Sequence, residues 1–570
     1  MFLLDLLIIG VVVWIILSRR DPAGTREGGL PSLRRMLQYS GLLASLAAAG
    51  VGFAGVLTLV FAGEEIAGSR TTELAMGLSL TLVATPVWLL LWRGVSRTLR
   101  ADVEERGSVG WALYLVAAMT GSLVVTVVNL VRLGDAVVGL EPFTPAALAF
   151  AIAAVGIWIG HLALSRRVDV SPTSTIARIG VLAGATVGLV ALAVGMGEAI
   201  AVGLEEWYWA VFGPPLAAAT TTVTLRHALV VAAVAAPVWW WHWLRQGRHD
   251  PGDQAWQGWL LLVAALGGLA TGLTGAGRAL ATTLEWLLRD PVITPAAHFS
   301  DLPPAVATAA VGATIWWYHR RVLARAADGG RAEPERTYTY LASGIGMVAA
   351  ATGATLSVAA AIQAAFGGMV ATRDLGAGEA LVWGLSLLIV GLPAWIVFWR
   401  RAQQRARTSS LSPAPIRRIY LLLVLGVATL TALVSLAVVL YAVFRDLLQR
   451  ELSVEVLAEL RIAIGLVVTT GAIAAYHAAV HRVDRAQVPV AVRIVRPSRV
   501  LLISPDGRQL ASAVATETGA RVRSLHRLDA PHLDIDAHAV SEAILAVRHP
   551  SVLVTVDADA SVRVIPYEPV

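Results

Sequence analysis

The sequence repeats one short stretch, Pro86-Val87-Trp88-Leu89-Leu90-Leu91-Trp92-Arg93, and this repetition decides the fold. The stretch ends an apolar run and leads into an Arg-rich segment. It returns as Pro237-Val238-Trp239 and as Pro393-Ala394-Trp395, each time with a second tryptophan four residues later. A motif that recurs at a regular interval indicates an internally repeated structure.

The composition is typical of a membrane protein. The chain has 570 residues and a mean hydropathy of +0.68, with 56% hydrophobic and only 15% charged residues. Its apolar residues fall in runs of about 20, the length of helix that crosses a hydrocarbon core of ~30 Å. A soluble chain of this size would carry a more polar surface. The absence of cysteine excludes disulfides, thiolate catalysis and cysteine-ligated metals.

The repeat has two levels. After an apolar run at residues 1–20, the pattern predicts a two-helix hairpin six times, and each hairpin ends at a marker position. Odd hairpins carry the Pro-x-Trp-x-x-x-Trp motif, whereas even hairpins carry a histidine three residues after the marker. The unit is therefore a four-helix module of about 157 residues, present three times. The markers are Trp88, Trp158, Trp239, Trp316, Trp395 and, in the last copy, Ala474.

The predicted fold is an all-α polytopic membrane protein of about 13 transmembrane helices, followed by a small α/β domain. After Val488 the hydropathy falls, and short alternating segments replace the long apolar runs. These segments predict strands at 499–504, 521–525, 551–556 and 562–565 and helices at 509–518 and 536–547. The expected domains are an N-terminal helix at 1–20, four-helix modules at 33–167, 175–325 and 336–485, and the α/β domain at 488–570.

The distribution of arginine predicts the orientation. Segments between hairpins are rich in arginine, as at Arg93 and Arg97, whereas segments within hairpins carry acids such as Glu64 and Glu65. Cytoplasmic loops of membrane proteins collect basic residues. We therefore expect a plasma-membrane protein with its N-terminus outside and its C-terminus in the cytoplasm. The same rule accounts for the net charge of +6, so we expect the lipid bilayer, and no nucleic acid, as the partner of these arginines.

The first and third odd hairpins agree in detail. Gly77-Leu78-Ser79-Leu80 matches Gly384-Leu385-Ser386-Leu387, which precedes the motif Pro393-x-Trp395-x-x-x-Trp399-Arg400. On these residues, the stretch from Leu33 to Arg485 resembles a bacterial domain-of-unknown-function family of tandem four-helix membrane units. The resemblance implies the fold and a membrane location. It implies no catalytic residues, and it does not extend to the C-terminal domain.

Four histidines recur beside the Trp and Arg residues of the helix ends, namely His161, His242, His319 and His477. One interpretation is a ring of equivalent imidazoles at the cytoplasmic face that senses pH or binds a metal. The other is that each histidine anchors its helix end among the lipid headgroups. We favour the second interpretation, because nothing in the sequence indicates that the four side chains converge.

Other candidates are polar residues in or near the apolar runs. Three pairs at the predicted outer ends of helices suggest either solute contacts of a transporter or, more commonly, ion pairs that close a helix end. Glu198 and Asn129 are the most deeply embedded polar residues, although we expect neither at the midplane, where transporters keep ionisable groups. The prolines Pro86, Pro237 and Pro393 are expected to kink their helices without breaking them. The pairs are Arg132 with Asp135, Arg289 with Asp290, and Arg445 with Asp446.

The soluble domain contains one His/Asp cluster. Such spacing occurs in metal sites, but a polar loop that leads into a helix has the same composition, and Asp534 or Asp536 is a natural N-cap. The cluster consists of His526, His532, Asp534, Asp536 and His538. The chain has no P-loop, no G-x-G-x-x-G after a strand, no H-E-x-x-H and no nucleophile elbow. We therefore expect no catalytic residues, no metal and no cofactor.

Two functions remain open at this stage. The first is a non-enzymatic membrane scaffold or sensor whose α/β domain at 488–570 meets a cytoplasmic protein partner. The second is a transporter or channel in which a small solute passes between pseudo-symmetric modules. The repeat, the apolar midplane and the single soluble domain favour the first.

Overall fold

The structure is a computed structural model. It describes residues 30–62, 70–167, 174–213, 218–247, 253–289, 293–327, 333–366, 376–408, 415–450, 455–487, 497–505, 507–529, 531, 535–547, 549–557 and 559–568. The expected helix at 1–20 lies outside the described residues. The chain divides into two compact units, Met1–Ala478 and Ala479–Val570, each of which is described by itself.

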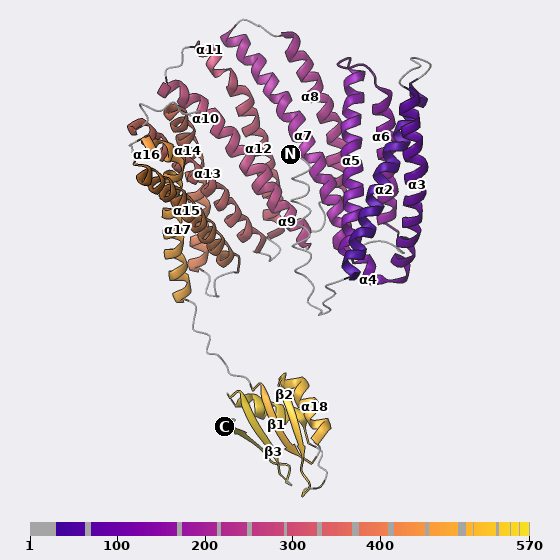
Figure 1. The fold of residues 1–570 in the computed structure, drawn as a ribbon, viewed down its shortest axis with the longest axis vertical. Coiled ribbons are helices and arrows are strands. Elements are labelled where there is room, and N and C mark those ends of the chain that lie inside the picture. The colour runs from indigo at the N-terminus through magenta and orange to yellow at the C-terminus, as the bar shows by residue number, and fades with distance from the viewer. Residues whose placement is uncertain are drawn as a thin grey trace. The chain divides into compact units, whose positions relative to one another are not determined.

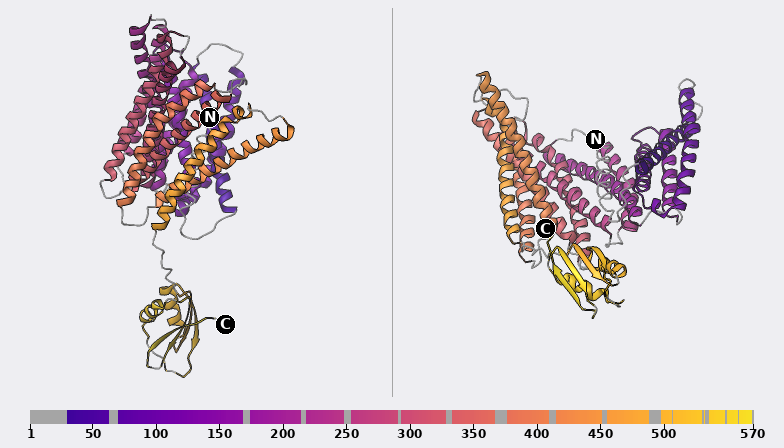
Figure 2. Two further views of the ribbon diagram at one scale, coloured as in Figure 1. Left: turned by 90° about the vertical axis from the view of Figure 1, so that its left-hand side faces the viewer. Right: turned by 60° about the horizontal axis from the view of Figure 1, so that its bottom comes forward.

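The first unit is built of long helices that follow one another as antiparallel hairpins (Figures 1 and 2). Among the described residues, eleven helical stretches are long and apolar enough to cross a membrane, and the chain is a multi-pass membrane protein. The long helices are α2 (Leu30–Phe61), α3 (Arg70–Ala101), α5 (Val109–Val137), α6 (Pro145–Ser165), α7 (Ser174–Phe212), α8 (Ala218–Trp239), α9 (Gln254–Leu262) with α10 (Thr271–Arg289), α12 (Leu302–Ala327), α13 (Glu333–Phe366), α14 (Ala377–Thr408), α15 (Pro415–Gln449) and α17 (Arg461–Gln487). Helix α12 occupies the fourth place of the second module, although it is not one of the eleven stretches.

The helices pack first within hairpins and then within modules. Helix α2 packs against α3, α5 against α6, α7 against α8, α10 against α12, and α13 against α14. In the first two modules the first helix also packs against the fourth, α2 against α6 and α7 against α12. Successive modules meet where α5 contacts α7 and α8, and where α10 contacts α14.

Glycine allows the two helices of a hairpin to approach closely. A Cβ built on Gly188 would lie 2.5 Å from the backbone nitrogen of Trp239, and one built on Gly346 would lie 2.5 Å from that of Trp395. Gly268 contacts the backbone of Trp316 in the same way. Small residues at such contacts are the usual means by which membrane helices pack. Three marker tryptophans, Trp239, Trp316 and Trp395, thus lie at close approaches of the hairpin backbones.

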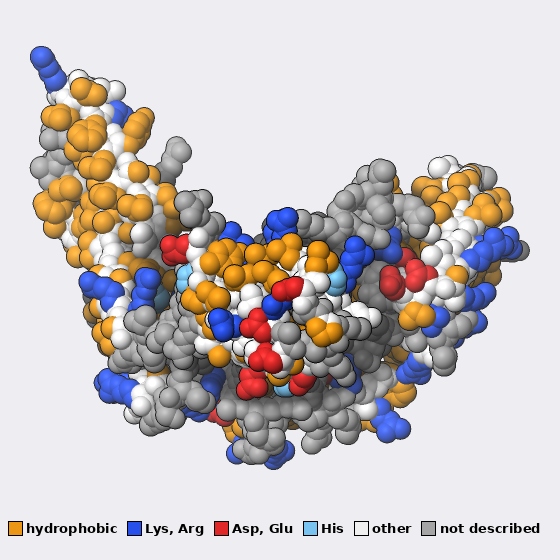
Figure 3. Space-filling model, turned by 90° about the horizontal axis from the view of Figure 1, so that it is seen from below, with side chains coloured by type: hydrophobic (Ala, Val, Ile, Leu, Met, Phe, Trp, Pro, Cys, Tyr) orange, Lys and Arg blue, Asp and Glu red, His pale blue; other side chains and the backbone are white. Residues whose placement is uncertain are grey.

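Many serine and threonine hydroxyls inside the helices bond to their own helix. Ser122 Oγ donates to the Ala118 carbonyl oxygen at 2.6 Å, and Ser386 Oγ donates to the Val382 carbonyl oxygen at 2.7 Å. Bonds of this kind, to a carbonyl four residues earlier, let hydroxyls lie in an apolar environment. On the outside, hydrophobic side chains cover much of the visible surface of the helices (Figure 3).

Two π-helices interrupt the second module. They are η1 (Trp240–Gly247), which follows α8, and η2 (Val263–Ala270), which joins α9 to α10. Pro86 and Pro393 lie inside α3 and α14, which continue past them, and Pro237 lies inside α8. Helices α3 and α14 continue past their prolines, as expected, whereas α8 ends at Trp239, two residues after Pro237, where the π-helix η1 begins.

Short helices connect some of the long ones, and the sequence pattern did not predict them. Asp102 caps the first of them, since its side chain accepts a hydrogen bond from the Glu104 backbone nitrogen at 2.8 Å. They are α4 (Val103–Arg106), α11 (Pro295–His298), the 3-10 helix η3 (Phe299–Asp301) and α16 (Glu455–Glu459).

The C-terminal unit is a four-stranded sheet with two helices on one face (Figure 1). The strand order is β2-β1-β3-β4, with β1 parallel to both of its neighbours and β4 antiparallel to β3. The elements are β1 (Arg499–Ser504), α18 (Gly507–Thr518), β2 (Arg521–His526), α19 (Ala537–Ala546), β3 (Ser551–Val556) and β4 (Val562–Pro566). Their bounds agree closely with those predicted from the sequence.

One face of this sheet carries the core and the other is uncovered. Val500, Leu502 and Val554 pack with Val514 of α18 and Ile544 of α19. Because side chains alternate along a strand, the residues between them point to the opposite face. That face, here called the open sheet face, pairs apolar side chains with arginines. It consists of Leu501, Ile503, Leu525, Leu553 and Ile565 with Arg499, Arg521, Arg523 and Arg563.

Candidate functional site

A cluster of aromatic rings and one histidine recurs in every module, at the Arg-rich ends of the helices. We call it the aromatic–histidine cluster. It brings together the second tryptophan of the odd marker, two residues three apart at the start of the third helix, and the histidine of the fourth helix. Its members are Trp92, Trp111, Tyr114 and His161 in the first module, Trp243, Trp256, Trp259 and His319 in the second, and Trp399, Arg417, Tyr420 and His477 in the third.

The clusters have matching geometry. In the first module the ring centroid of Tyr114 lies 5.5 Å from that of His161. In the second, Trp259 lies 5.6 Å from His319. In the third, Tyr420 lies 6.1 Å from His477. The four-helix repeat thus places equivalent residues in equivalent contacts.

Each repeat histidine is fixed by its own helix. The Nδ1 atom lies 2.8–2.9 Å from the carbonyl oxygen four residues earlier in all four cases. A carbonyl oxygen only accepts, so Nδ1 carries the proton and donates it. In the neutral ring, Nε2 is then an acceptor that points away from its helix. The donors are His161, His242, His319 and His477, and their acceptors are, in the same order, the carbonyl oxygens of Ile157, Val238, Ile315 and Ile473.

The surroundings of Nε2 differ between modules. In the first, Tyr114 Oη donates to His161 Nε2 at 2.8 Å, and the Trp88 indole nitrogen lies 3.4 Å from the same hydroxyl. In the second and third, Nε2 of His319 and of His477 is buried and has no hydrogen-bond partner among the described residues. Both imidazoles are only 1% exposed and lie among aromatic rings. Both rings thus pack against aromatic neighbours of their own module.

A second hydrogen bond repeats in two modules. The Trp243 indole nitrogen donates to Tyr318 Oη at 3.0 Å, and the Trp399 indole nitrogen donates to Tyr476 Oη at 2.7 Å. The tyrosine precedes the repeat histidine in both cases. The first module has Gly160 at this position.

The repeat histidines lie in separate environments. No two of them are in ring contact within the described part of the chain. His242, on η1, lies edge-on to Trp158 of the first module, with ring centroids 5.7 Å apart. Gly184 of α7 makes room for it, because a Cβ there would overlap the imidazole. Residues of the described chain form no group of three potential metal ligands.

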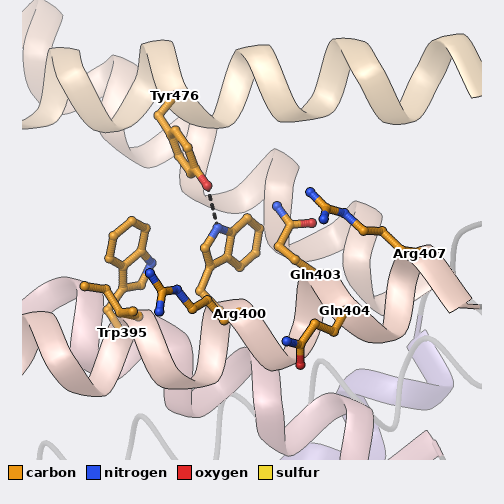
Figure 4. A pocket seen from close by; sticks show the side chains of 8 residues that line it. Trp395, Arg400, Gln403, Gln404, Arg407 and Tyr476 are labelled. Atoms are coloured by element: carbon orange, nitrogen blue, oxygen red, sulfur yellow. Dashed lines mark hydrogen bonds between the residues drawn. The ribbon is translucent and has the colours of Figure 1, made fainter.

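The third module adds a pocket of about 410 Å³ beside its cluster. The pocket lies between α14 and α17, and its side chains project from both helices (Figure 4). Helix α14 supplies most of the lining, and α17 supplies Tyr476. The lining residues are Trp395, Ile396, Trp399, Arg400, Gln403, Gln404, Arg407 and Tyr476.

The three Arg/Asp pairs predicted at the outer helix ends differ in their bonding partners. Asp135, buried at the end of α5, accepts from His227 Nδ1 of α8 at 2.9 Å, so its partner is not Arg132. Arg289 bonds to Glu285 one turn earlier at 2.9 Å, and Asp290 lies outside the described residues. Arg445 and Asp446 bond to each other at 2.7 Å.

Two acidic residues that the sequence did not single out organise the Arg-rich ends. Glu105 of α4 is buried and accepts from Arg35 Nε and from Tyr39 Oη, both at 2.8 Å. Glu335 accepts from Arg320 and Arg405, both at 2.8 Å, and so joins α13 to α12 and α14. Their only sequence signal is an acid within an Arg-rich segment.

The embedded polar residues differ in their contacts. Asn129 Nδ2 donates to the Val125 carbonyl oxygen at 2.8 Å. Glu198 is half-buried near the middle of the 39-residue helix α7. A smaller polar pocket of about 160 Å³ lies between α10, η3 and α14. Its charged lining residues are Arg278, Glu285, Asp301 and Glu379.

In the α/β domain, three of the five residues of the predicted His/Asp cluster are described, and they form no group of three potential metal ligands. Asp536 caps α19, accepting from the His538 backbone nitrogen at 2.9 Å, while His526 ends β2. His532 and Asp534 lie outside the described residues. Nearby, Arg527 donates to Asp529 and to Asp557, both at 2.7 Å. These bonds hold the pKa of Arg527 above, and that of Asp529 below, its ordinary value.

Comparison with known proteins assigns the membrane unit to a family. The model described as "Domain of unknown function (DUF5671)" matches residues 35–162, 178–300, 259–375 and 336–472. Three matches begin close to the starts of the three modules, and the match at 259–375 begins at the second hairpin of the middle module. No curated protein and no solved structure matches the chain.

Proposed function

Because the chain belongs to the family described as a domain of unknown function (DUF5671), a description that carries no activity, we propose a function from its own residues. The protein is a non-enzymatic scaffold or sensor of the plasma membrane. Its three four-helix modules hold a C-terminal α/β domain in the cytoplasm, where that domain meets a protein partner.

The orientation rests on the arginines. The Arg-rich ends of the helices carry Arg93, Arg320 and Arg400, and basic residues favour the cytoplasmic side. We expect the α/β domain in the cytoplasm, because the sequence predicts thirteen helices and an outer N-terminus. The indoles of the clusters lie at the same ends, where tryptophan favours the headgroup region.

The observation that carries the proposal is the open sheet face. The domain has a complete core between its sheet and its two helices, and yet Leu525 and Ile565 of the other face remain 44% and 39% exposed. Arginines flank this apolar strip. Such a surface fits a protein partner that presents acidic groups around apolar side chains.

The repeat residues of the membrane unit support the same proposal. The aromatic–histidine clusters use their histidines to pack helices within each module. This is what a rigid membrane support requires, and it leaves the α/β domain as the part that recognises a partner.

The experiment reverses one charge on the open sheet face. The full-length protein, the Arg523→Glu variant and the Arg508→Glu variant are compared for partner capture from the native membrane fraction by quantitative proteomics. Arg523 lies beside Leu501 on the open face, whereas Arg508 is exposed on α18. We expect Arg523→Glu to lose at least one specific partner that Arg508→Glu retains. Equal partner sets for all three proteins would contradict this surface as the docking site.

A transporter of a small solute is the second candidate. Two observations favour it, the half-buried Glu198 near the middle of α7 and the polar pocket around Glu285 and Glu379. The two functions differ in whether water reaches the side chain at position 198. Cysteine introduced at Glu198 would react with a membrane-impermeant thiol reagent in a transporter and would stay unreactive in a scaffold.

A further inference from the structure

The third aromatic–histidine cluster departs from the other two at one position. In the first two modules another indole stacks on the second tryptophan of the odd marker motif. The ring centroids of Trp92 and Trp111 are 6.1 Å apart, and those of Trp243 and Trp256 are 6.3 Å apart. The third module has Arg417 at this position, and its guanidinium carbon lies 5.8 Å from the Trp399 ring centroid. A guanidinium thus takes the place of an indole and brings a buried positive charge beside the pocket.

Arg417 also sets the orientation of one pocket side chain. Its Nη2 donates to Gln403 Oε1 at 2.7 Å. Because a guanidinium only donates, this bond turns the amide oxygen of Gln403 toward Arg417. The NH2 group of Gln403 can then donate a hydrogen bond to a ligand in the pocket.

The pocket is lined by hydrogen-bond donors, and no Asp or Glu is among its lining residues. Arg400, Gln403 and Arg407 follow each other at intervals of three and four residues, so they form one stripe along α14. Figure 4 shows Gln403 and Arg407 on the side of α14 that faces Tyr476 of α17, whereas Gln404 projects from the opposite side. Tyr476 Oη accepts from the Trp399 indole, which leaves its own proton free to be donated.

Two positive charges in the stripe are not compensated within the described chain. Arg405, on the same helix, is paired with Glu335. Arg400 and Arg407 are exposed, and neither has an ion-pair partner among the residues that the structure describes. The site therefore offers two guanidiniums, an amide and a phenol to one ligand, and this set fits an anion with several oxygens.

We propose that this pocket binds a phosphate group, supplied by the headgroup of an anionic phospholipid. Positions seven apart on a helix lie ~10 Å apart along its axis, so Arg400 and Arg407 approach one phosphate from two sides while Gln403 donates between them. The indoles of Trp395 and Trp399 favour the headgroup region, where lipid phosphates are concentrated. Basic pockets between membrane helices are suited to such headgroups.

The test measures lipid binding to the full-length protein in neutral detergent. Phosphatidylglycerol and phosphatidylcholine, each with a fluorophore on an acyl chain, report binding by anisotropy. The Arg400→Gln/Arg407→Gln variant removes both guanidiniums, and the Arg93→Gln/Arg97→Gln variant removes two exposed arginines from the equivalent helix of the first module. We expect the pocket variant to weaken phosphatidylglycerol binding by roughly tenfold or more, since two charge-assisted contacts are lost, and the control to change it by less than about twofold.

A second variant guards against a folding defect. Arg400→Lys/Arg407→Lys keeps both charges, and we expect it to bind phosphatidylglycerol more tightly than the glutamine variant. Glycerol 1-phosphate, titrated up to millimolar concentration, distinguishes the source of the phosphate. Displacement only in large molar excess over the lipid supports the headgroup, because glycerol 1-phosphate carries the same phosphate without acyl chains. Displacement at a concentration equal to that of the lipid would overturn the lipid and assign a free phosphate compound. Equal weakening by the pocket and control variants, or equal binding of the two lipids, would overturn the site.

Discussion

At the scale of single residues, the repeat histidines are explained by two contacts. Each donates Nδ1–H to its own helix, and each packs its ring against aromatic neighbours. The sequence predicted which histidines are equivalent, because the period is visible in the chain. It did not predict the partner of Asp135, because His227 lies 92 residues away on another module. Contacts between distant segments depend on how the modules pack, which no local pattern encodes.

The difference between modules leads to a first prediction. His161→Phe removes the bond from Tyr114 and leaves a buried hydroxyl without an acceptor, whereas His477→Phe removes an Nε2 that has no partner. We expect His161→Phe to lower the free energy of unfolding in mixed detergent micelles by about 1 kcal/mol more than His477→Phe does. A larger loss for His477→Phe would show that its Nε2 has a partner in the native protein.

The Asp135–His227 contact is tested by a double-mutant cycle. Alanine is introduced at each position and at both, and unfolding is measured as above. We expect a coupling energy of about 1 kcal/mol, because the two side chains bond directly across α5 and α8. The parallel cycle of Arg132 with Asp135 is expected to give a coupling close to zero. The opposite ranking would restore the pair suggested by the sequence.

At the scale of elements, the long helices and the strands followed the sequence because hydrophobic periodicity determines them. Strand β1 has the predicted bounds, since alternation and a following turn mark both of its ends. The π-helices η1 and η2 did not follow from the pattern, because a change from i−4 to i−5 bonding leaves the apolar pattern intact. The pocket was not predicted either, because Tyr476 of α17 reaches it from a helix about 70 residues further along the chain than its α14 lining.

Hairpin packing gives a prediction with a matched control. A Cβ at Gly346 would meet the Trp395 backbone, whereas one at Gly426 of α15 meets nothing within 4 Å. We expect Gly346→Ala to destabilise the protein by about 1–3 kcal/mol through overpacking. Gly426→Ala should be neutral or stabilising by up to about 1 kcal/mol, because alanine is the better helix former. Thermal unfolding in detergent checks both. Equal effects would contradict the close approach of α13 and α14.

The cap of α19 gives a prediction for the soluble domain. Asp536→Ala removes the acceptor of the His538 backbone nitrogen at the first turn. Its loss should lower the free energy of unfolding of the domain by about 1 kcal/mol. Asp559→Ala, in the turn between β3 and β4, is a comparison that leaves the Asp536 cap of α19 in place. Urea denaturation followed by far-ultraviolet circular dichroism measures both variants. An unchanged Asp536→Ala midpoint would contradict the cap.

At the scale of the whole molecule, the internal repeat is found both in the sequence pattern and in the matches of the family model. The family matches at 35–162, 178–300 and 336–472 follow the three modules. The further match at 259–375 begins half a module later, which indicates that odd and even hairpins are themselves related. Marker positions such as Trp88 and Trp395 carry this information, because they lie where helix backbones and aromatic rings meet. The family matches do not cover the α/β domain, to which we assign partner recognition in our proposal.

The most direct test of the scaffold is capture with and without that domain. The full-length protein and a chain that ends at residue 487 are purified from the same membranes under the same conditions, and their bound proteins are compared quantitatively. The account predicts that at least one abundant partner of the full-length protein is absent from the shortened one, while both integrate into the membrane equally. An identical set of partners for the two chains would contradict it.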